Sequence, residues 1–283
     1  MTGELTFLGT GTSMGVPTLG CDCEVCTSTD PHDKRLRPSV LIRWTEAPSA
    51  SAQDSPPLDP NLDATHRAVR TVIIDTGPDF RAQALHIGLK HVDAVFYTHS
   101  HADHILGLDD LRPLSFEWYR TGGSIPLYAT EETRNALNRI FSYTFSPMST
   151  YPTRARVCLQ PVKEHNPLWG VDFISIPVLH GELPITGYRF GRVAYLTDVS
   201  AIPESSFDLL TGLDVLIISA LRHKPHPSHT TVEQALSWAA RIGARQTWFT
   251  HIAHELGHAA TNRMLPEGVA LAYDGLTLPV KFA

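Results

Sequence analysis

The sequence of 283 residues predicts an α/β fold of the αββα type, one domain spanning residues 1–283 in which two sheets lie between layers of helices. Short apolar runs alternate with helical patterns and long loops in two successive series, which is typical of sheets covered by helices. Apolar residues make up 42% of the chain and charged residues 18%, so the chain can bury a large core. No repeat at a solenoid period is visible, which argues against a repeat architecture.

The first series contains four apolar segments that predict strands. They are Leu5–Leu8, Ser39–Trp44, Thr71–Ile74 and Ala94–Tyr97. The segment Phe80–Ile87 predicts a short helix. Residues 46–70 are rich in Ala, Ser, Pro and Asp and have no sustained period. We therefore expect a surface insertion there that joins two strands, rather than a linker between domains.

The second series begins with a helical pattern over Glu131–Tyr143. Its predicted strands are Phe173–Val178, Tyr188–Phe190, Val193–Leu196, Val215–Ile218 and Trp248–Thr250. Gly191 and Arg192 are expected to turn the hairpin between the second and third of these strands. Thr230, with Glu233 three residues later, predicts a capping box at the start of a helix.

Charge and cysteine content restrict the class of protein. The formal net charge of −6 gives no general attraction for nucleic acid, so we do not expect a nucleic-acid partner. The first residues lack a basic segment followed by an apolar one, and no window holds eighteen consecutive apolar residues, so we expect a cytoplasmic protein without a membrane partner. Three of the four cysteines lie within six positions, which suits metal thiolates in a reducing compartment better than disulfides.

A histidine-rich cluster directly follows the predicted strand Ala94–Tyr97. Its potential ligands are His99, His101, Asp103 and His104. In extended backbone, His99 and His101 point to the same side. Four ligands within six residues suit two adjacent cations better than one tetrahedral ion.

Four further candidates stand next to the ends of predicted strands. They are Asp75, His180, Asp198 and His251. Each alone would more often be a turn or cap residue. Together with the histidine cluster, they favour one site at one edge of a rigid sheet. We expect Asp75 to contact a ligand histidine at the ring nitrogen that does not bind metal. The alternative is an aspartate that caps a turn.

The N-terminal loop carries a second pattern, C-x-C-x2-C, formed by Cys21, Cys23 and Cys26. Three thiolates are one ligand short of a closed tetrahedral zinc site. His254, three residues after His251, is the candidate for the fourth. Such a site would be structural and would tie the N-terminal loop to a C-terminal loop. The alternative is a set of buried or oxidisable cysteines.

The sequence around the histidine cluster, Thr98-His99-Ser100-His101-Ala102-Asp103-His104, resembles the H-x-H-x-D-H motif of the metallo-β-lactamase superfamily. Five further segments resemble one branch of it, the phosphodiesterases that open phosphoribosyl 1,2-cyclic phosphate in phosphonate metabolism (the carbon–phosphorus lyase pathway). These segments are Phe7–Ser13, Cys21–Cys26, Ile74–Phe80, Asp109–Pro113 and Thr197–Ser200. The resemblance covers nearly the whole chain and implies an αββα sandwich of two mixed sheets flanked by helices.

The resemblance also implies how the ligands are divided. One divalent metal ion, zinc or manganese, would be held by His99, His101 and His180. The second would be held by Asp103, His104 and His251, with Asp198 bridging the two. A hydroxide shared by the metals would be the nucleophile, which Asp103 could orient. The histidine of the family that matches His229 serves as general acid, and the family also supports His254 as ligand of one structural zinc ion.

The function that we expect is a metal-dependent phosphodiesterase that acts on a small cyclic phosphate ester. A lactonase or thioesterase could use the same two-metal site, but the cysteine loop and the region of His229 favour phosphodiesters. An RNA-processing nuclease of the same superfamily is a further alternative, against which stands the acidic net charge. A non-catalytic metal-binding module is a third, which a complete set of ligands for two metals disfavours.

Four other residues are weaker candidates. Arg112 and Tyr143 are candidates for the substrate pocket, with helix packing or surface positions as equal alternatives. His223 and His226 are expected to be solvated loop residues. The sequence leaves a homodimer open.

Overall fold

The computed structural model describes residues 1–46, 69–116, 118, 122–148, 151 and 153–282, and every structural statement below refers to these residues. Of the insertion expected at 46–70, residues 47–68 lie outside the described residues. The two flanks of that segment are neighbours, because Thr45 and Val69 are cross-strand partners. The Nε atom of Arg70 also donates to Oε2 of Glu46 at 2.8 Å.

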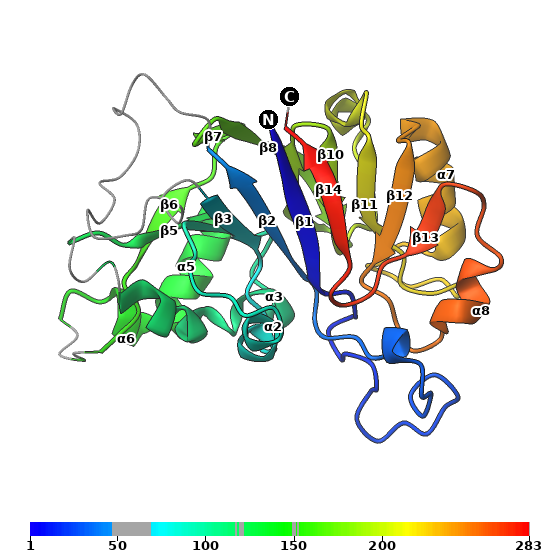
Figure 1. Cartoon of the computed structure of the whole chain (residues 1–283), viewed down its shortest axis with the longest axis horizontal. Helices are drawn as coiled ribbons and strands as arrows, with labels where there is room; N and C mark the ends of the chain where they lie inside the picture. The colour runs from blue at the N-terminus through cyan, green and yellow to red at the C-terminus, as the bar shows by residue number, and fades with distance from the viewer. Residues whose placement is uncertain (47–68, 117, 119–121, 149–150, 152, 283) are drawn as a thin grey trace.

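The first sheet has the strand order β14-β1-β2-β3-β4-β5-β6. Its strands are β1 (Thr2–Gly9), β2 (Ser39–Thr45), β3 (Val69–Ile74), β4 (Ala94–Phe96), β5 (Ile125–Ala129), β6 (Val157–Pro161) and β14 (Thr277–Lys281). Pairing is antiparallel from β14 to β3 and parallel from β3 to β6. The sheet is therefore mixed, and it places a C-terminal strand beside the N-terminal one (Figure 1).

The second sheet has the strand order β13-β12-β11-β10-β9-β8-β7. Its strands are β7 (His165–Leu168), β8 (Val171–His180), β9 (Leu183–Phe190), β10 (Val193–Leu196), β11 (Val215–Ser219), β12 (Gln246–Thr250) and β13 (Val269–Leu271). Pairing is antiparallel from β7 to β10 and parallel from β10 to β13, so this sheet is mixed as well. The hairpin predicted around Gly191 joins β9 to β10.

Helices cover the outer sides of the two sheets (Figure 1). Those beside the first sheet are α2 (Phe80–His86), α3 (Ala102–Ile105), α5 (Glu131–Ile140) and α6 (Ser142–Phe145), and those beside the second are α7 (Val232–Ile242) and α8 (His258–Asn262). Short 3-10 helices span Pro31–Asp33, Leu108–Leu111, Pro113–Ser115, Glu204–Ser206 and Asp208–Leu210. This arrangement confirms the predicted αββα sandwich. Within the described residues, no helix is both long and apolar enough to span a bilayer.

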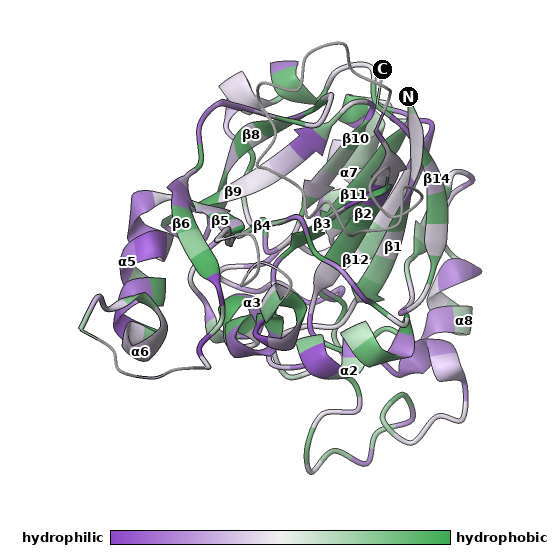
Figure 2. Ribbon diagram, turned by 60° about the vertical axis from the view of Figure 1, so that its left-hand side comes forward, coloured by the Kyte–Doolittle hydropathy of each residue, from purple (hydrophilic) through white to green (hydrophobic). Residues whose placement is uncertain are grey.

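Apolar side chains fill three layers. Between the sheets, the ring of Phe96 on β4 stacks on Phe173 of β8 at a centroid distance of 4.8 Å. A second cluster packs α7 against the second sheet, and a third packs α2 and α5 against the first. Figure 2 shows the strands largely in hydrophobic colours and helices such as α5 with hydrophilic surfaces. Burial of this apolar area is the main stabilising contribution to the fold.

One local prediction was wrong, and another was confirmed except at its end. The helix predicted over Glu131–Tyr143 is present as α5 but ends at Ile140, because Phe141 leaves helical geometry with φ −105° and ψ 40°, and α6 follows as a separate turn. The cap of α7 is Thr231, whose hydroxyl accepts from the backbone N–H of Gln234 at 3.2 Å. Thr230 instead donates its hydroxyl to the carbonyl oxygen of Val199, a tertiary contact that removes it from the capping position.

Candidate metal centre

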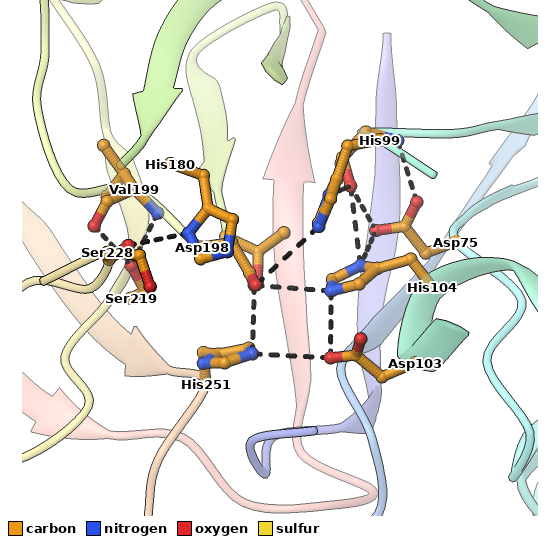
Figure 3. A network of polar contacts seen from close by, with 12 residues as sticks. Asp75, His99, Asp103, His104, His180, Asp198, Val199, Ser219, Ser228 and His251 are labelled. Atoms are coloured by element: carbon orange, nitrogen blue, oxygen red, sulfur yellow. Dashed lines mark hydrogen bonds and ion pairs between the residues drawn. The ribbon is translucent and has the colours of Figure 1, made fainter. Parts of the chain in front are cut away.

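The candidate ligands meet because each follows the end of a strand at one edge of the sandwich. His99 lies three residues after β4, and His180 is the last residue of β8. Asp198 lies two residues after β10, and His251 directly follows β12. Figure 3 shows these side chains pointing toward one another from opposite sheets. The structure therefore brings these predicted residues together at the strand ends.

One group of potential ligands is built around the first histidine pair. Its members are His99, His101, His180 and Asp198, whose ligand atoms all lie within 4.8 Å of one another. Nε2 of His99 is 3.9 Å from Oδ2 of Asp198. The ring of His101 is 4.5 Å from that of His99 and 5.0 Å from that of His180, between centroids. These four atoms could hold one metal ion.

A second group shares Asp198 with the first. Its members are Asp103, His104, Asp198 and His251, again with ligand atoms within 4.8 Å. Oδ1 of Asp198 is 3.4 Å from Nε2 of His104 and 3.0 Å from Nε2 of His251. Oδ2 of Asp103 approaches the same two nitrogens at 3.3 and 3.7 Å. The two oxygens of Asp198 thus face different groups, as a bridging carboxylate requires.

Several of these atoms are buried without a hydrogen-bond partner among the described residues. They are Nε2 of His99, Nε2 of His104, Nε2 of His251 and Oδ2 of Asp103. A buried polar atom that makes no hydrogen bond costs about 1–3 kcal/mol, so four converging ones would be a large penalty. Divalent cations satisfy both imidazole lone pairs and carboxylate oxygens. The donor set therefore fits metal ions.

Hydrogen bonds at Nδ1 fix the ring orientation of two of the ligand histidines. Nδ1 of His104 is 2.7 Å from Oδ2 of Asp75, and Nδ1 of His180 donates to the carbonyl oxygen of Ser228 at 2.6 Å. Since carbonyl and carboxylate oxygens only accept, both imidazoles carry hydrogen on Nδ1, which leaves Nε2 as the nitrogen that a metal ion could bind in place of a proton. Asp75 is itself held by the backbone N–H and the hydroxyl of Thr98, each at 2.8 Å.

The backbone is strained where the strands end. Asp75, Asp198 and His251 have φ values of 65°, 54° and 54°, a region that residues other than glycine adopt at a cost of about 1–3 kcal/mol. Gly77 allows α3 to approach this turn, because a Cβ atom there would lie 2.1 Å from the carbonyl oxygen of Asp103. Tight turns at the strand ends therefore aim the side chains into the site.

The electrostatics of the site favour cations. Burial lowers the pKa of His104, but the carboxylates of Asp103 and Asp198 outweigh it, so this pKa lies well above its ordinary value. Burial raises the pKa of Asp198, but His251 and His104 bring it well below its usual range. Positive charge is thus stabilised between these groups. Burial lowers the pKa of His99 well below the ordinary value, which keeps that imidazole neutral, as a metal ligand must be.

His229 lies beside the two groups, although it belongs to neither. Its ring stacks on that of His251 at 4.8 Å and lies 4.5 Å from that of His180. Burial, reinforced by His251, lowers the pKa of His229 to about 3. His226 lies 4.8 Å from His229, with Nδ1 3.3 Å from the backbone nitrogen of Ser228. His226 is therefore partly buried against the site, not the solvated loop residue that was expected.

The cysteine loop meets His254 as expected. The Sγ atoms of Cys21, Cys23 and Cys26 lie 3.3, 3.3 and 3.6 Å from Nδ1 of His254. The backbone N–H of Cys26, followed by His254, lowers the pKa of Cys23 to about 6, which favours the thiolate that binds metals. These four atoms could hold a metal ion between the N-terminal loop and the segment before α8.

The remaining candidates lie on the surface. His223 is exposed and pairs with Glu233 through Nδ1 at 2.6 Å, as expected for a solvated residue. Arg112 donates to the hydroxyl of Tyr151 at 3.3 Å, and the ring of Tyr143 lies 5.8 Å from that of Tyr151. This exposed cluster includes none of the candidate metal ligands.

The carbonyl of Ser228 and the hydroxyl of Thr98 were missed from the sequence, although both adjoin predicted site residues. Thr98 precedes His99 and Ser228 precedes His229, so position in the motif was the available signal. Their partners are distant in sequence. Only the fold shows that Ser228 orients His180 and that Thr98 holds Asp75.

Two mixed sheets between helices, with paired histidine and aspartate groups at the strand ends, define a metallo-β-lactamase-type protein. The chain belongs to the β-lactamase superfamily domain family, whose model matches residues 70–252. This confirms the resemblance seen in the sequence and supports a metal-dependent hydrolase.

The comparison with solved structures indicates which branch of the superfamily this chain resembles. A crystal structure described as a new diphosphatase from the PhnP family shares 50% identity, covers 99% of this chain and 98% of its own, and superposes with a TM-score of 0.84. The protein is thus PhnP-like. Zinc-bound PqqB from Methylobacterium extorquens matches at 19% identity, 97% and 99% coverage and a TM-score of 0.69, which bears on the fold alone.

Curated relatives carry other names. An octanoyltransferase of Porphyromonas gingivalis is 37% identical over 95% of this chain, but the chain spans only 50% of that protein. A coenzyme PQQ synthesis protein B of Methylorubrum extorquens is 26% identical over 92% of this chain and 81% of its own length. Because half of the first relative has no counterpart here, the name of the whole protein does not transfer to this chain.

Proposed function

We propose that this protein is a two-metal phosphodiesterase that cleaves a P–O bond in a small cyclic phosphate ester. The observation that carries the proposal is the pair of ligand groups joined through the two oxygens of Asp198. Two ligand groups that share one carboxylate could hold two cations side by side, and such a pair would offset charge on the attacking and leaving oxygens of a phosphoryl group.

In this proposal, His99, His101 and His180 would hold one ion, Asp103, His104 and His251 would hold the other, and Asp198 would be a ligand shared by both. Zinc or manganese suits these nitrogen and carboxylate donors. When bound, the ions lower the pKa of a coordinated water and offset the charge on phosphoryl oxygens. Asp75 and Ser228 keep the ligand imidazoles in the required tautomer.

Two side chains have catalytic roles in the proposal. Asp103, whose Oδ2 faces the other ligand atoms of the second group, has a second carboxylate oxygen that can accept from the attacking water and orient it. His229 donates a proton to the leaving alkoxide. Its low pKa means that it is neutral without substrate, and a phosphate anion in contact with the ring favours the protonated form. His229 would therefore gain its proton together with the substrate.

A diphosphate is the second candidate substrate, because the 50% identical neighbour is described as a diphosphatase. Both reactions are attack on phosphorus by the same groups. They differ in the leaving group, since a phosphate leaves with less need of a proton than an alkoxide does. Substitution of His229 should therefore reduce kcat much more for a cyclic phosphate ester than for a diphosphate.

We also propose one structural zinc ion bound by Cys21, Cys23, Cys26 and His254, a single domain over residues 1–283, and a cytoplasmic location. The site is supported by four donors within 4.8 Å of one another. The single domain is supported by the pairing of β14 with β1 in one sheet. The location is supported by the thiols, which must stay reduced to bind metal.

The experiment is a turnover screen of protein reconstituted with zinc or with manganese. The substrates are ribose 1,2-cyclic phosphate, 2′,3′-cyclic nucleotides, a dinucleoside diphosphate, a lactone and a thioester, with octanoyl transfer as a further assay. We expect the highest kcat/KM with a cyclic phosphate, and loss of that activity in His99→Ala without loss of the fold. Faster turnover of the lactone or thioester would contradict the proposal, and preference for the diphosphate would select the second candidate.

A further inference from the structure

A short extended segment, Leu221–Arg222, lies between two loops that border the candidate metal centre. The first loop is formed by residues 223–230 and the second by residues 251–257. On one side, the N–H of Leu221 donates to the carbonyl oxygen of Thr230 at 3.0 Å. On the other side, the N–H of Ala253 donates to the carbonyl oxygen of Leu221 at 3.0 Å. The first loop carries His229, and the second carries His251 and His254. The segment therefore sets the spacing of the two loops.

The guanidinium group of Arg222 makes three contacts that span both loops. Its Nε donates to the carbonyl oxygen of Lys224 at 3.2 Å, and its Nη2 donates to that of Pro225 at 3.4 Å. Its Nη1 donates to Oε1 of Glu255 at 3.0 Å. A planar fork of donors can hold all three acceptors at once, whereas the single ammonium group of a lysine cannot reproduce that geometry.

The turn held by Arg222 leads directly to the histidines at the site. Pro225 and Pro227 fix two of the φ angles on the way to His229, so little freedom remains to absorb a shift of the turn. Ser228 also accepts from Nδ1 of the ligand residue His180 at 2.6 Å. A displaced turn would thus move the ring of His229 and the hydrogen bond that orients His180.

We propose that Arg222 is a positioning residue, which fixes the turn at Lys224–Pro225 and so places His229 over the centre, with Glu255 as its anchor on the neighbouring loop. The proposal rests on the function proposed for His229. Arg222 and Glu255 are partly exposed, so the ion pair itself adds little stability. Its effect is on geometry, and a catalytic readout should respond more than thermal stability does.

The test compares Arg222→Lys with Arg192→Lys. Arg192 forms a similar partly exposed ion pair with Asp214, at 2.9 Å, in the turn between β9 and β10. In Arg222→Lys, we expect kcat for alkyl phosphodiesters to fall about tenfold, while kcat for p-nitrophenyl esters falls much less because that leaving group needs no proton. Faster hydrogen exchange at residues 223–230 should accompany the loss of kcat, with both quantities measured in protein saturated with metal. Arg192→Lys should change none of these quantities.

Equal loss of kcat with both leaving groups, or unchanged kcat and exchange, would overturn the proposal. Glu255→Gln provides a second test, since the double variant with Arg222→Lys should lose less than the sum of the two single effects if the residues act as a pair. Strict additivity would contradict the anchoring role. Absence of phosphodiesterase activity in the unaltered protein would instead refute the proposed function, and the exchange comparison would still decide whether Arg222 orders the turn.

Discussion

Nδ1 of His104 lies 2.7 Å from Oδ2 of Asp75, and both side chains are fully buried. Asp75 accepts two further hydrogen bonds from Thr98, so its carboxylate cannot rotate away from the imidazole. The contact holds Nε2 of His104 toward Asp103 and Asp198. Asp75, which belongs to neither ligand group, thus fixes the orientation of His104, which belongs to the second group.

Asp75→Asn should weaken metal binding about 10- to 100-fold, because the amide either loses the acceptor for His104 or opposes it with a donor. Asparagine tolerates the φ of 65° at this position, so the backbone should survive. The measurement is metal content after dialysis against a buffered chelator. Asp93→Asn is the control, since Asp93 is equally buried but pairs with Arg70 at 3.2 Å. Asp93→Asn should lower the free energy of unfolding and leave the metal content unchanged. Similar metal loss in both variants would refute the role of Asp75 in orienting His104.

The local sequence predicted those parts of the site that lie in one continuous motif. His99, His101, Asp103 and His104 could be identified together because strand, turn and ligands follow one another within a few residues. Asp198 and His251 were recognisable as polar residues at strand ends. Their convergence depends on the packing of two sheets, which no local pattern contains. The assignment of these ligands to two metal ions therefore rests on the family resemblance and on the geometry of the folded chain, and the spacing of the residues in the sequence does not supply it.

Strands β5, β6, β7, β13 and β14 were not predicted, for a physical reason. Four of them contain proline, at Pro126, Pro161, Pro167 and Pro279, and β13 is only three residues long. Proline and short length are typical of strands near sheet edges, and both weaken the apolar period on which prediction depends. Thr230 and Thr231 are equivalent as capping residues by type, and only the contact of Thr230 with Val199 decides between them.

Cys23→Ser should lower the zinc content by one equivalent and the melting temperature by about 5 °C, because the site joins segments more than 200 residues apart. Catalytic turnover at low temperature should change much less. Cys158→Ser is the matched control, since Cys158 lies on β6 and contacts Gln160 instead of the cysteine loop. An unchanged melting temperature in Cys23→Ser would argue against a structural ion.

His258 should make the fold sensitive to acid. Burial, followed by the charge of Arg35, lowers the pKa of His258 to about 4, below the ordinary value of 6.5. Between these values, the unfolded chain binds a proton that the folded chain does not, so the free energy of unfolding falls as the pH drops from about 6.5 to 4. Above pH 6.5 this contribution is constant.

His258→Gln should therefore flatten the decline of the urea midpoint between pH 6.5 and 4. Any loss of metal in acid is common to both proteins, so the difference between them reports His258. His165→Gln is the control, because His165 is exposed and its pKa is raised by Asp172, the opposite sign. A slope that is the same in all three proteins would show that His258 does not contribute to acid sensitivity.

His229→Ala should reduce kcat by about 10²- to 10⁴-fold for substrates with alkyl leaving groups, the range ordinarily removed with a general acid. The ring stacks on His251 but is not among the potential ligands, so metal content should be unchanged. With p-nitrophenyl esters the loss should be small, since p-nitrophenolate leaves without a proton. The measurement is kcat across a series of leaving groups of rising pKa, in which the variant should show the steeper dependence. His226→Ala provides the comparison on the same loop. Equal loss across the series in His229→Ala would mean that His229 binds the phosphate without donating a proton, and loss of metal in the variant would place the residue among the ligands instead.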